Sequence, residues 1–261
     1  MKKVILIVVC IICLSFVLSE NVYAMSDKPL GFYCVRNKEH KQPALDGEMS
    51  FIERYDAYYV DKAHGDTVDE KVIYLTFDAG YENGNIEKIL NVMKQEGVKG
   101  TFFILENLIV KNPDLVRRMA NEGHTVGNHT CKHKDMTTFD DIETFSAELE
   151  ALNRLYEETT GYKMSLYYRP PEGKFDERSL SYAQQLGYKT IFWSFAYADW
   201  DNNKQLSHDA SMKKIMDNIH NGEIMLLHPT SATNAEILGD LIRELKAQGY
   251  RFGKIDELIT K

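Results

Sequence analysis

The chain has 261 residues, of which 39 are acidic and 31 basic, giving a formal net charge of −8. This balance argues against a nucleic-acid-binding protein, because such proteins carry a basic patch or stripe. The length suits one large domain with its own hydrophobic core.

The N-terminus has the layout of a secretory signal peptide. Lys2 and Lys3 precede an apolar run over residues 4–18, and Val22-Tyr23-Ala24 offers a small-residue cleavage site. The run is shorter than the roughly 20 residues that a membrane-spanning helix requires. We therefore expect residues 1–24 to be removed on export, leaving no membrane span, with an uncleaved anchor as the alternative.

Cysteine usage allows one intramolecular disulfide after cleavage. Cys10 and Cys13 lie within the expected signal peptide, and the rest of the chain contains Cys34 and Cys131. An exported protein meets an oxidising compartment in which such a pair can be linked. We expect two free thiols, with the disulfide as the alternative.

Residues 25–70 lack a regular period and contain Pro29, Pro43 and a polar stretch over residues 61–70. From Lys71 onward, short β-branched and aromatic runs alternate with segments of helical period, which predicts alternating strands and helices. The expected strands cover residues 72–77, 101–105, 125–127, 166–168, 190–195 and 223–227. The expected helices have their apolar residues within 86–93, 115–119, 142–156, 180–186, 212–219 and 237–245, and end at Gly97, Gly123, Gly161, Gly187, Gly222 and Gly249.

Strands that alternate with helices of this length form βαβ units and a mainly parallel sheet. No glycine-rich phosphate loop follows the first strand, which argues against a doubly wound sheet. We expect an irregular or open (β/α) barrel of about seven strands, fewer than the eight of a regular barrel. The expected organisation is a signal peptide (1–24), a lead-in segment packed on the barrel (25–70) and a catalytic domain (71–261).

Five polar residues each follow the end of an expected strand. In chain order they are Asp78, His129, Arg169, Asp199 (with Trp200) and His228. The carboxyl ends of barrel strands form one face of the molecule, and active sites are built on that face. We therefore expect these side chains to lie close together.

Each of these residues alone has an ordinary structural explanation. Asp78 could cap a turn, Arg169 could belong to a surface loop, and His228 could be a satisfied histidine near the core. His129 and His133 stand four residues apart, a spacing that can bring two imidazoles to one side of a helical turn and suits a metal ion. Two surface histidines are the simpler interpretation of that pair.

Together the residues supply what hydrolysis of a stable amide requires. Water needs a base, the carbonyl needs a Lewis acid or oxyanion donors, and the departing amine needs an acid. A carboxylate, a histidine pair and a separate histidine match these roles. An arginine and a second carboxylate remain to orient the base and the acid.

Five motifs carry these residues: Thr76-Phe77-Asp78, His129-Thr130-Cys131-Lys132-His133, Arg169-Pro170-Pro171-Glu172-Gly173, Trp193 with Asp199-Trp200, and Leu226-Leu227-His228. In this order, over about residues 70–255, they resemble the motifs of the polysaccharide deacetylases with a NodB-homology domain, carbohydrate esterase family 4. The resemblance implies hydrolysis of an acetyl group through a tetrahedral intermediate, without a covalent enzyme adduct.

The resemblance also implies roles for individual residues. Asp78 is the general base, held by Arg169, and His228 is the general acid, oriented by Asp199. The substrate or oxyanion region contains Glu172, Gly173, Trp193 and Trp200.

The implied metal site is where the sequence departs most from the family pattern. By resemblance, His129 and His133 bind a divalent metal, for which zinc is the expected ion by ligand type. The family's usual second aspartate, the third ligand, is replaced by Ala79, whose methyl group cannot coordinate a metal. Glu172 replaces a common aromatic residue, a smaller change because the oxyanion contribution expected there is a backbone N–H.

A narrower resemblance concerns the substrate. Gly31-Phe32, residues 37–43 and residues 76–84 are similar to the sporulation-type deacetylases that act on N-acetylmuramic acid, in which the second aspartate is also absent. This resemblance implies peptidoglycan glycan strands as the partner, muramic δ-lactam in spore cortex as the product, and a location in the cell wall or spore envelope. Deacetylation frees the C2 amine, and the lactyl carboxyl on C3 lies within ring-closing reach of it. We expect a monomer.

Three other functions remain open at this point. The same site suits an N-acetylglucosamine deacetylase that acts on chitin or peptidoglycan. A non-catalytic wall-binding domain would explain Ala79 as decay of the metal site. A glycosidase with Asp78 and Asp199 as its carboxylate pair is a weaker hypothesis, because it leaves the histidines without a role.

Overall fold

The computed structural model of the protein describes residues 26–258, so the expected signal peptide lies outside the described part of the chain. Its strands are β1 (Leu30–Gly31), β2 (Cys34–Val35), β3 (Ala44–Leu45), β4 (Ala57–Tyr58), β5 (Lys71–Ala79), β6 (Thr101–Ile104), β7 (Thr125–Asn128), β8 (Tyr167–Tyr168), β9 (Lys174–Phe175), β10 (Lys189–Ile191), β11 (Glu223–Leu227) and β12 (Tyr250–Phe252). The α-helices are α1 (Ile86–Glu96), α2 (Glu106–Lys111), α3 (Pro113–Asn121), α4 (Ile142–Thr160), α5 (Glu177–Gln185), α6 (His208–Met216) and α7 (Ala232–Ala247).

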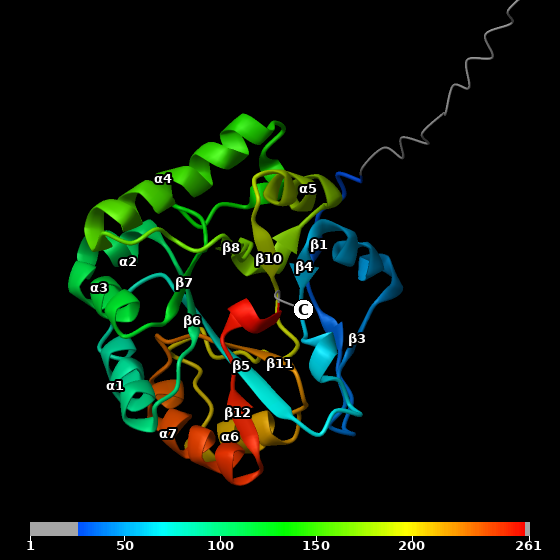
Figure 1. Cartoon of the computed structure of the whole chain (residues 1–261), viewed down its shortest axis with the longest axis vertical. Helices are drawn as coiled ribbons and strands as arrows, with labels where there is room; N and C mark the ends of the chain where they lie inside the picture. Colours follow the sequence, from blue (N-terminus) through cyan, green and yellow to red (C-terminus); the bar gives the residue numbers. More distant parts are fainter. Residues whose placement is uncertain (1–25, 259–261) are drawn as a thin grey trace, which may run out of the picture.

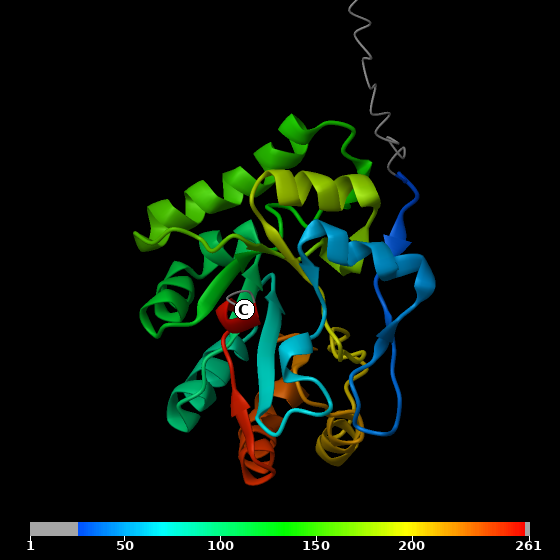
Figure 2. The same ribbon diagram turned by 45° about the vertical axis from the view of Figure 1, so that its right-hand side comes forward.

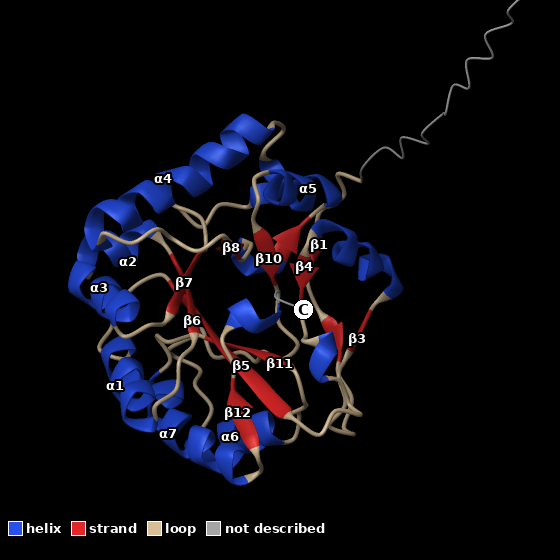
Figure 3. Ribbon diagram, in the orientation of Figure 1, coloured by secondary structure: helices blue, strands red, loops and turns tan. Residues whose placement is uncertain are grey.

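The main sheet is a curled parallel sheet that forms an incomplete barrel (Figure 1). Its strand order is β11-β5-β6-β7-β8-β10-β4, and β12 pairs in parallel with the beginning of β5. Helices α1–α7 lie outside the strands (Figure 3), as βαβ connections require, whereas a short 3-10 helix over Ile255–Leu258 lies at one end of the barrel interior. The predicted open barrel of about seven strands is confirmed.

The segment after β10 explains how the two ends of the sheet are linked. The backbone N–H of Phe192 donates to the carbonyl of Tyr58, next to β4, while the N–H of Ser194 donates to the carbonyl of Ile224 in β11. The chain therefore crosses from one end of the sheet to the other within three residues. The prediction of a strand over residues 190–195 is wrong beyond Ile191 for this reason.

Side chains of β5 alternate between two apolar regions, as the pleat of a strand requires. Ile73, Leu75, Phe77 and Ala79 face the helices and belong to the largest apolar cluster. Val72 and Tyr74 belong to a separate cluster inside the barrel. Asp78 shares the parity of the inward-facing residues, so the strand itself directs this carboxylate into the open end of the barrel.

Glycines end the helices largely where the sequence predicts. Gly97 and Gly161 are the C-caps of α1 and α4, both in the left-handed conformation that favours glycine. The prediction for the helix over residues 212–219 is less accurate, because α6 ends at Met216 and leaves a short loop before Gly222. Helix α2 was not predicted.

The N-terminal segment lies along the side of the barrel that helices α1–α4 leave uncovered (Figure 2). Strand β4 joins the main sheet beside β10, and β1 pairs with β9, which follows the Arg169–Gly173 motif. Phe32 donates its N–H to the carbonyl of Gly173 and stacks on Phe192 at a ring-centroid distance of 4.2 Å. This segment therefore packs directly behind one of the motif loops.

Glu223, the first residue of β11, is a fully buried carboxyl group. Its Oε2 accepts the N–H of His220 at 3.2 Å, and its Oε1 has no hydrogen-bond partner among the described residues. Burial raises the pKa of Glu223 well above its usual range, against the opposing effects of that N–H and of Arg36. The folded protein therefore holds a neutral carboxyl group at this position near neutral pH.

We expect Glu223 to make stability fall as pH rises. Below the pKa of an unfolded glutamate the group is protonated in both states; above it only the unfolded state ionises, so unfolding becomes easier. Glu223→Gln should reduce this fall, measured as urea midpoints between about pH 5 and pH 8. The exposed Glu236→Gln is the matched control. A Glu223→Gln protein with the wild-type pH dependence would contradict the prediction.

Candidate active site

The five predicted polar residues meet at the open end of the barrel. Asp78 lies near the end of β5, while His129, Arg169 and His228 directly follow β7, β8 and β11. Asp199 lies in the loop between β10 and α6. The strand-end rule thus brings together residues that are up to 150 positions apart in the chain.

Arg169 is fully buried, and all of its guanidinium nitrogens are hydrogen-bonded. Nη1 donates to Asp78 Oδ1 at 2.8 Å and Nη2 donates to Thr76 Oγ1 at 2.9 Å. The remaining bonds run from Nε to the carbonyl of Ile191 and from Nη2 to that of Phe192, at 2.8 and 3.0 Å. The guanidinium also lies 4.2 Å from the ring centre of Phe103. The guanidinium of Arg169, itself held by these contacts, fixes the Asp78 carboxylate in one orientation.

Asp78 is an ionised carboxylate in this environment. Burial by itself would raise its pKa, but the positive charge of Arg169, with contributions from His129 and His228, lowers the pKa below the ordinary value. One carboxylate oxygen bonds to Arg169, and the other, Oδ2, lies 3.6 Å from His129 Nε2. The group is therefore charged and keeps one oxygen directed toward the cavity.

The histidine pair is formed by a loop. Residues 129–133 contain no helical turn, and Thr130 and His133 both have positive φ angles, of 70° and 55°. The helical turn that the four-residue spacing allows is not formed, because two residues with left-handed backbone bend the chain instead. This bend places the two imidazole rings 5.1 Å apart, at an angle of 74°.

The state of His129 suits a metal ligand. Burial lowers its pKa to about 4, so the ring is neutral at physiological pH. Its Nδ1 lies 2.8 Å from the carbonyl of Arg169 and must carry the proton that bonds there. Nε2 is then an unprotonated nitrogen 3.6 Å from Asp78 Oδ2, and its lone pair would be available to hold a metal ion.

The metal site is nonetheless incomplete in side-chain ligands. Within residues 26–258, no three histidine, cysteine, aspartate or glutamate side chains are grouped as metal sites usually are. Ala79, at the place of the family's usual third ligand, is fully buried in the apolar cluster beneath the helices. The residues present fit a divalent ion with His129 and His133 as ligands and open positions for other oxygens.

His228 and Asp199 form the second half of the site. His228 Nδ1 lies 2.7 Å from Asp199 Oδ1, and the backbone N–H of His228 donates to Oδ2 at 2.8 Å. Burial alone would lower the pKa of His228, but the hydrogen bond and charge of Asp199, with the charge of Asp78, raise it above the ordinary value. Asp199 therefore holds the imidazole in one orientation, and the raised pKa favours its protonated form.

Asn234 was not predicted as a site residue. It lies in the first turn of α7, and its Nδ2 donates to Asp199 Oδ2 at 2.6 Å and to the carbonyl of His228 at 3.1 Å. Tyr197 in turn bonds to the Asn234 side chain. Thr76 was likewise not predicted as a site residue, although its hydroxyl oxygen accepts a hydrogen bond from Arg169 Nη2. Ser231 is the N-cap of α7 and accepts the backbone N–H of Asn234, so the helix start places the Asn234 side chain beside Asp199.

Both halves of the site open into one cavity of about 610 Å³, which we call the catalytic cavity. Asp78, His129 and His133 line one part, and His228 lines another. The predicted substrate residues Glu172, Gly173, Trp193 and Trp200 also line it, with Ala196, Tyr197 and Leu226. Trp200 is 59% exposed and lies edge-on to His228, with ring centroids 5.9 Å apart.

Glu172 has an unusual backbone in this cavity, with φ of 57° in the left-handed region. Its carboxylate is paired with Lys174 at 2.8 Å. The adjacent Gly173 also has positive φ, and a Cβ there would lie 2.7 Å from the Trp193 ring. The motif therefore needs glycine at position 173 for both conformation and space.

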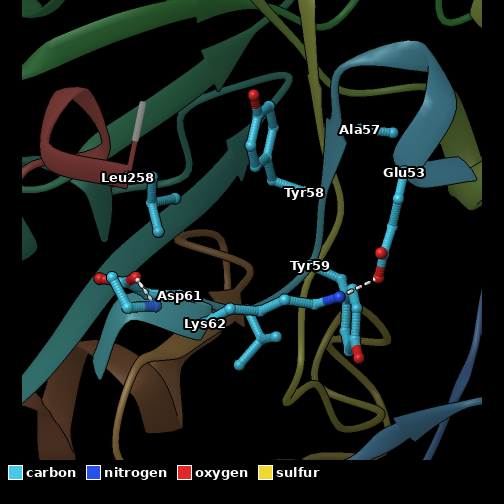
Figure 4. A pocket seen from close by; sticks show the side chains of 9 residues that line it. Glu53, Ala57, Tyr58, Tyr59, Asp61, Lys62 and Leu258 are labelled. Carbon is cyan, nitrogen blue, oxygen red and sulfur yellow. Dashed lines mark hydrogen bonds and ion pairs between the residues drawn. The ribbon is translucent and has the colours of Figure 1, made fainter. Parts of the chain in front are cut away.

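A second region, away from these residues, forms a pocket of about 270 Å³ beside β4 (Figure 4). It is lined by residues 57–63 together with Glu53 and Leu258, and Lys62 pairs there with Glu53. None of the predicted site residues lines this pocket. The acid, base and histidine groups needed for hydrolysis lie in the catalytic cavity.

Cys34 and Cys131 are both free thiols, as expected. Cys34 donates to the carbonyl of Ser194, and Cys131 donates to Glu106 Oε2 at 2.7 Å. The two residues therefore have separate polar partners.

Comparison with known proteins shows the family to which the chain is similar. The sequence model described as polysaccharide deacetylase matches residues 65–191. The chain is 40% identical to the peptidoglycan-N-acetylmuramic acid deacetylase PdaA of Bacillus subtilis, covering 96% of this chain and 95% of PdaA. The solved structure of PdaA, described as a family 4 carbohydrate esterase, has a TM-score of 0.84 over 90% of this chain and 98% of that one.

Two other similar proteins have different printed descriptions. The peptidoglycan-N-acetylglucosamine deacetylase PgdA of Listeria monocytogenes is 33% identical over 72% of this chain and 39% of its own. BA3943 of Bacillus anthracis, described as a CE4 family pseudoenzyme, is 29% identical with a TM-score of 0.68, over 77% of this chain and 68% of that one. Identity to PdaA over nearly the whole length confirms the resemblance seen in the motifs. The chain belongs to the polysaccharide deacetylase family, a family of hydrolases.

Proposed function

We propose that this protein hydrolyses the N-acetyl group of N-acetylmuramic acid in peptidoglycan. The observation that carries the proposal is the pairing of an ionised carboxylate, Asp78, with a proton-carrying imidazole, His228, in the wall of one cavity. The similarity to PdaA over 96% of the chain supports muramic acid as the substrate.

In the proposed reaction, Asp78 is the base that takes a proton from the attacking water. Arg169 keeps the carboxylate ionised and leaves Oδ2 free to accept that proton. Water attacks the acetyl carbon, and the carbonyl becomes a tetrahedral oxyanion. Glu172, Gly173 and Trp193 line the cavity in which the substrate would bind.

His228 is the proposed acid for the departing amine. Its raised pKa keeps a proton available near neutral pH, and Asp199 holds the ring through Nδ1 so that Nε2 carries the proton to be transferred. Asn234 positions Asp199 rather than touching the substrate. Transfer of this proton to the C2 nitrogen breaks the carbon–nitrogen bond and releases acetate.

His129 and His133 are the proposed ligands of a divalent metal, with zinc favoured by the ligand type. When bound, such an ion would supply Lewis-acid polarisation of the acetyl carbonyl. The neutral state of His129 leaves its Nε2 available for this role.

The deacetylated sugar is the proposed precursor of muramic δ-lactam in spore cortex, which forms when the freed amine attacks the lactyl carboxyl carbon, a C–N bond replaces the C–OH bond, and water leaves. The test is mass spectrometry of purified glycan strands after incubation, looking for loss of acetyl and then of water. Acetate loss confined to N-acetylglucosamine would instead assign the activity named for PgdA. Absence of any acetate would favour a non-catalytic wall-binding protein; among the relatives, BA3943 is described as a pseudoenzyme.

We also propose export across the cytoplasmic membrane and action as a monomer in the cell wall or spore envelope. No helix in residues 26–258 is long and apolar enough to span a membrane. The support for export is the charge and apolar length of residues 1–24 and the cell-wall substrate of the relatives. N-terminal sequencing of protein from its host tests the cleavage, and retention of Met1 would overturn it.

Asp199→Asn should lower activity most strongly on the alkaline side of the pH profile. Removing the charge of Asp199 removes a cause of the raised pKa of His228, so the acid loses its proton at lower pH. The loss should be smaller than that from removing His228, because the proton donor itself remains. The pH dependence of kcat measures this, with Asp201→Asn as control. An unchanged alkaline limb would contradict the assigned role.

A further inference from the structure

Helix α4 buries a glutamate on the face that otherwise carries its apolar side chains. Glu148 is 9% exposed and belongs to the buried face of the helix with Phe145 and Leu152. A glutamate is seldom buried to this extent unless its carboxylate has partners. Both oxygens of Glu148 have a partner in or directly after residues 129–133, which we call the histidine loop. One of these partners is the ammonium group of Lys134, 3.2 Å from Oε2.

The other oxygen of Glu148 bonds to the backbone of the loop. Its Oε1 accepts the N–H of Lys132 at 2.7 Å. A second connection reaches the same turn of α4 through Asn128, whose Oδ1 accepts the N–H of Thr130 at 2.8 Å. The Nδ2 of Asn128 donates to the carbonyl of Leu149 at 2.9 Å. One turn of the helix is therefore tied to the loop at two backbone positions.

These two positions lie where the loop backbone is least favourable. Thr130 and His133 both have positive φ angles, a conformation that residues other than glycine seldom adopt and that is rarest for β-branched ones. Such conformations persist where the surrounding structure enforces them. The bond to Asn128 acts on Thr130 itself, and the bond to Glu148 acts on Lys132, directly before His133.

A second acidic side chain, that of Glu106 in α2, also contacts the loop. It pairs with the Lys132 ammonium and accepts a hydrogen bond from the Cys131 thiol. Its side chain is 26% exposed, against 9% for that of Glu148, and exposed ion pairs contribute little because water screens them. The bonds of the Glu106 carboxylate also end on side chains, which can rotate while the backbone stays in place. Glu148 is therefore the acidic group that acts most directly on the loop backbone.

We propose that Glu148 is a positioning residue that holds the histidine loop in the conformation that binds the metal. This inference rests on the proposed function, in which His129 and His133 are the metal ligands. A loop that adopts the binding conformation only part of the time binds its ligand more weakly in the same proportion. Glu148 acts through the backbone of Lys132 and thereby sets the metal affinity of the two histidines.

Zinc titration by calorimetry tests this role. Glu148→Met fills a similar space without an oxygen, and we expect its zinc affinity to fall by about 10–100-fold, the usual cost of losing a group that orients a metal ligand. Glu148→Gln keeps an acceptor for the Lys132 N–H and should lie nearer to wild type. The matched control is Glu150→Met, on the exposed face of the same helix, which should bind zinc as wild type does.

Exchange of the Lys132 backbone amide, followed by NMR in metal-free protein, tests the same contact without zinc. Lys132 is an exposed residue, so slow exchange of its N–H reports the bond to Glu148. The protection should be present in wild type and Glu150→Met and lost in Glu148→Met. Should Glu148→Met fail to fold, the wild-type protein decides, because a Lys132 amide that exchanges at the rate of an unstructured chain would overturn the inference.

The outcomes separate the role of Glu148 from the proposed function. Equal zinc affinities for Glu148→Met and Glu150→Met would overturn the positioning role. Equally weak binding by Glu148→Gln and Glu148→Met would also overturn it, since the charge rather than the hydrogen bond would then be responsible. If wild-type protein binds no zinc, the proposed metal site fails, and the exchange rate of the Lys132 amide alone decides whether Glu148 holds the loop.

Discussion

Asp78→Asn and His228→Ala will each lower the rate of acetate release by about 10²–10⁴, the usual loss for a positioned acid or base. Asparagine keeps an oxygen that accepts the Arg169 hydrogen bond, but it cannot take a proton from water. Alanine at 228 removes the imidazole, while Asp199 keeps the backbone N–H of residue 228 and Asn234 as donors. Both variants should therefore remain folded, with thermal melting curves close to wild type.

The matched control is an aspartate–histidine pair outside the site. His208 and Asp209 lie at the start of α6, where the Asp209 side chain is fully exposed. His208→Ala and Asp209→Asn should retain normal turnover. Near-normal acetate release by either Asp78→Asn or His228→Ala would refute the assignment of base and acid.

Chelation of the metal will reduce activity strongly, and added zinc will restore it. The reason is that His129 and His133 leave a zinc ion with fewer than the three protein ligands usual in catalytic sites, so the ion should dissociate readily. Acetate release and a calorimetric zinc titration measure the effect. Full activity in a demonstrably metal-free preparation would refute metal-assisted catalysis in this protein.

Ala79→Asp should change stability in two opposite ways. Without metal, a carboxylate at this fully buried position among apolar side chains lowers the melting temperature. With zinc, the carboxylate would become a third ligand by turning from the helix-facing side of β5 toward His129 and His133, and the metal should then raise the melting temperature more than it does in wild type. Ala79→Asn is the control, being similar in size but a weaker ligand. Equal zinc affinities for Ala79→Asp and wild type would mean that position 79 does not face the ion.

The sequence predicts the parts of this molecule that depend on local periodicity. Strand β5 and helix α1 have the expected patterns, and the strand-end rule places Asp78 and His228 at one end of the barrel. Strand β4 has only two residues, Ala57 and Tyr58, too few to show an alternating pattern. Its presence in the sheet depends on pairing with β10, far along the chain.

Site contacts that depend on tertiary structure were also beyond prediction. Asn234 and Asp199 are 35 positions apart in the chain, and no sequence pattern near either residue predicts their hydrogen bond. The path of residues 129–133 is set by the left-handed backbone at Thr130 and His133, which the four-residue spacing of the histidines does not reveal. Spacing along the chain named residues that the fold brings together, but it did not give the backbone path between His129 and His133.

The contact of Phe32 with Gly173 and Phe192 has a consequence for how the enzyme can be divided. The family match begins at residue 65, yet the loop that carries Glu172 is braced by a segment that begins near Leu30. A fragment that began at the start of the matched region and ran to the end of the chain would keep Asp78, His129, His133 and His228 while losing the β1–β9 pairing. The enzyme therefore needs residues that precede its homology region, and a protease cut just after Phe32 is expected to lower activity while leaving the chemical groups untouched.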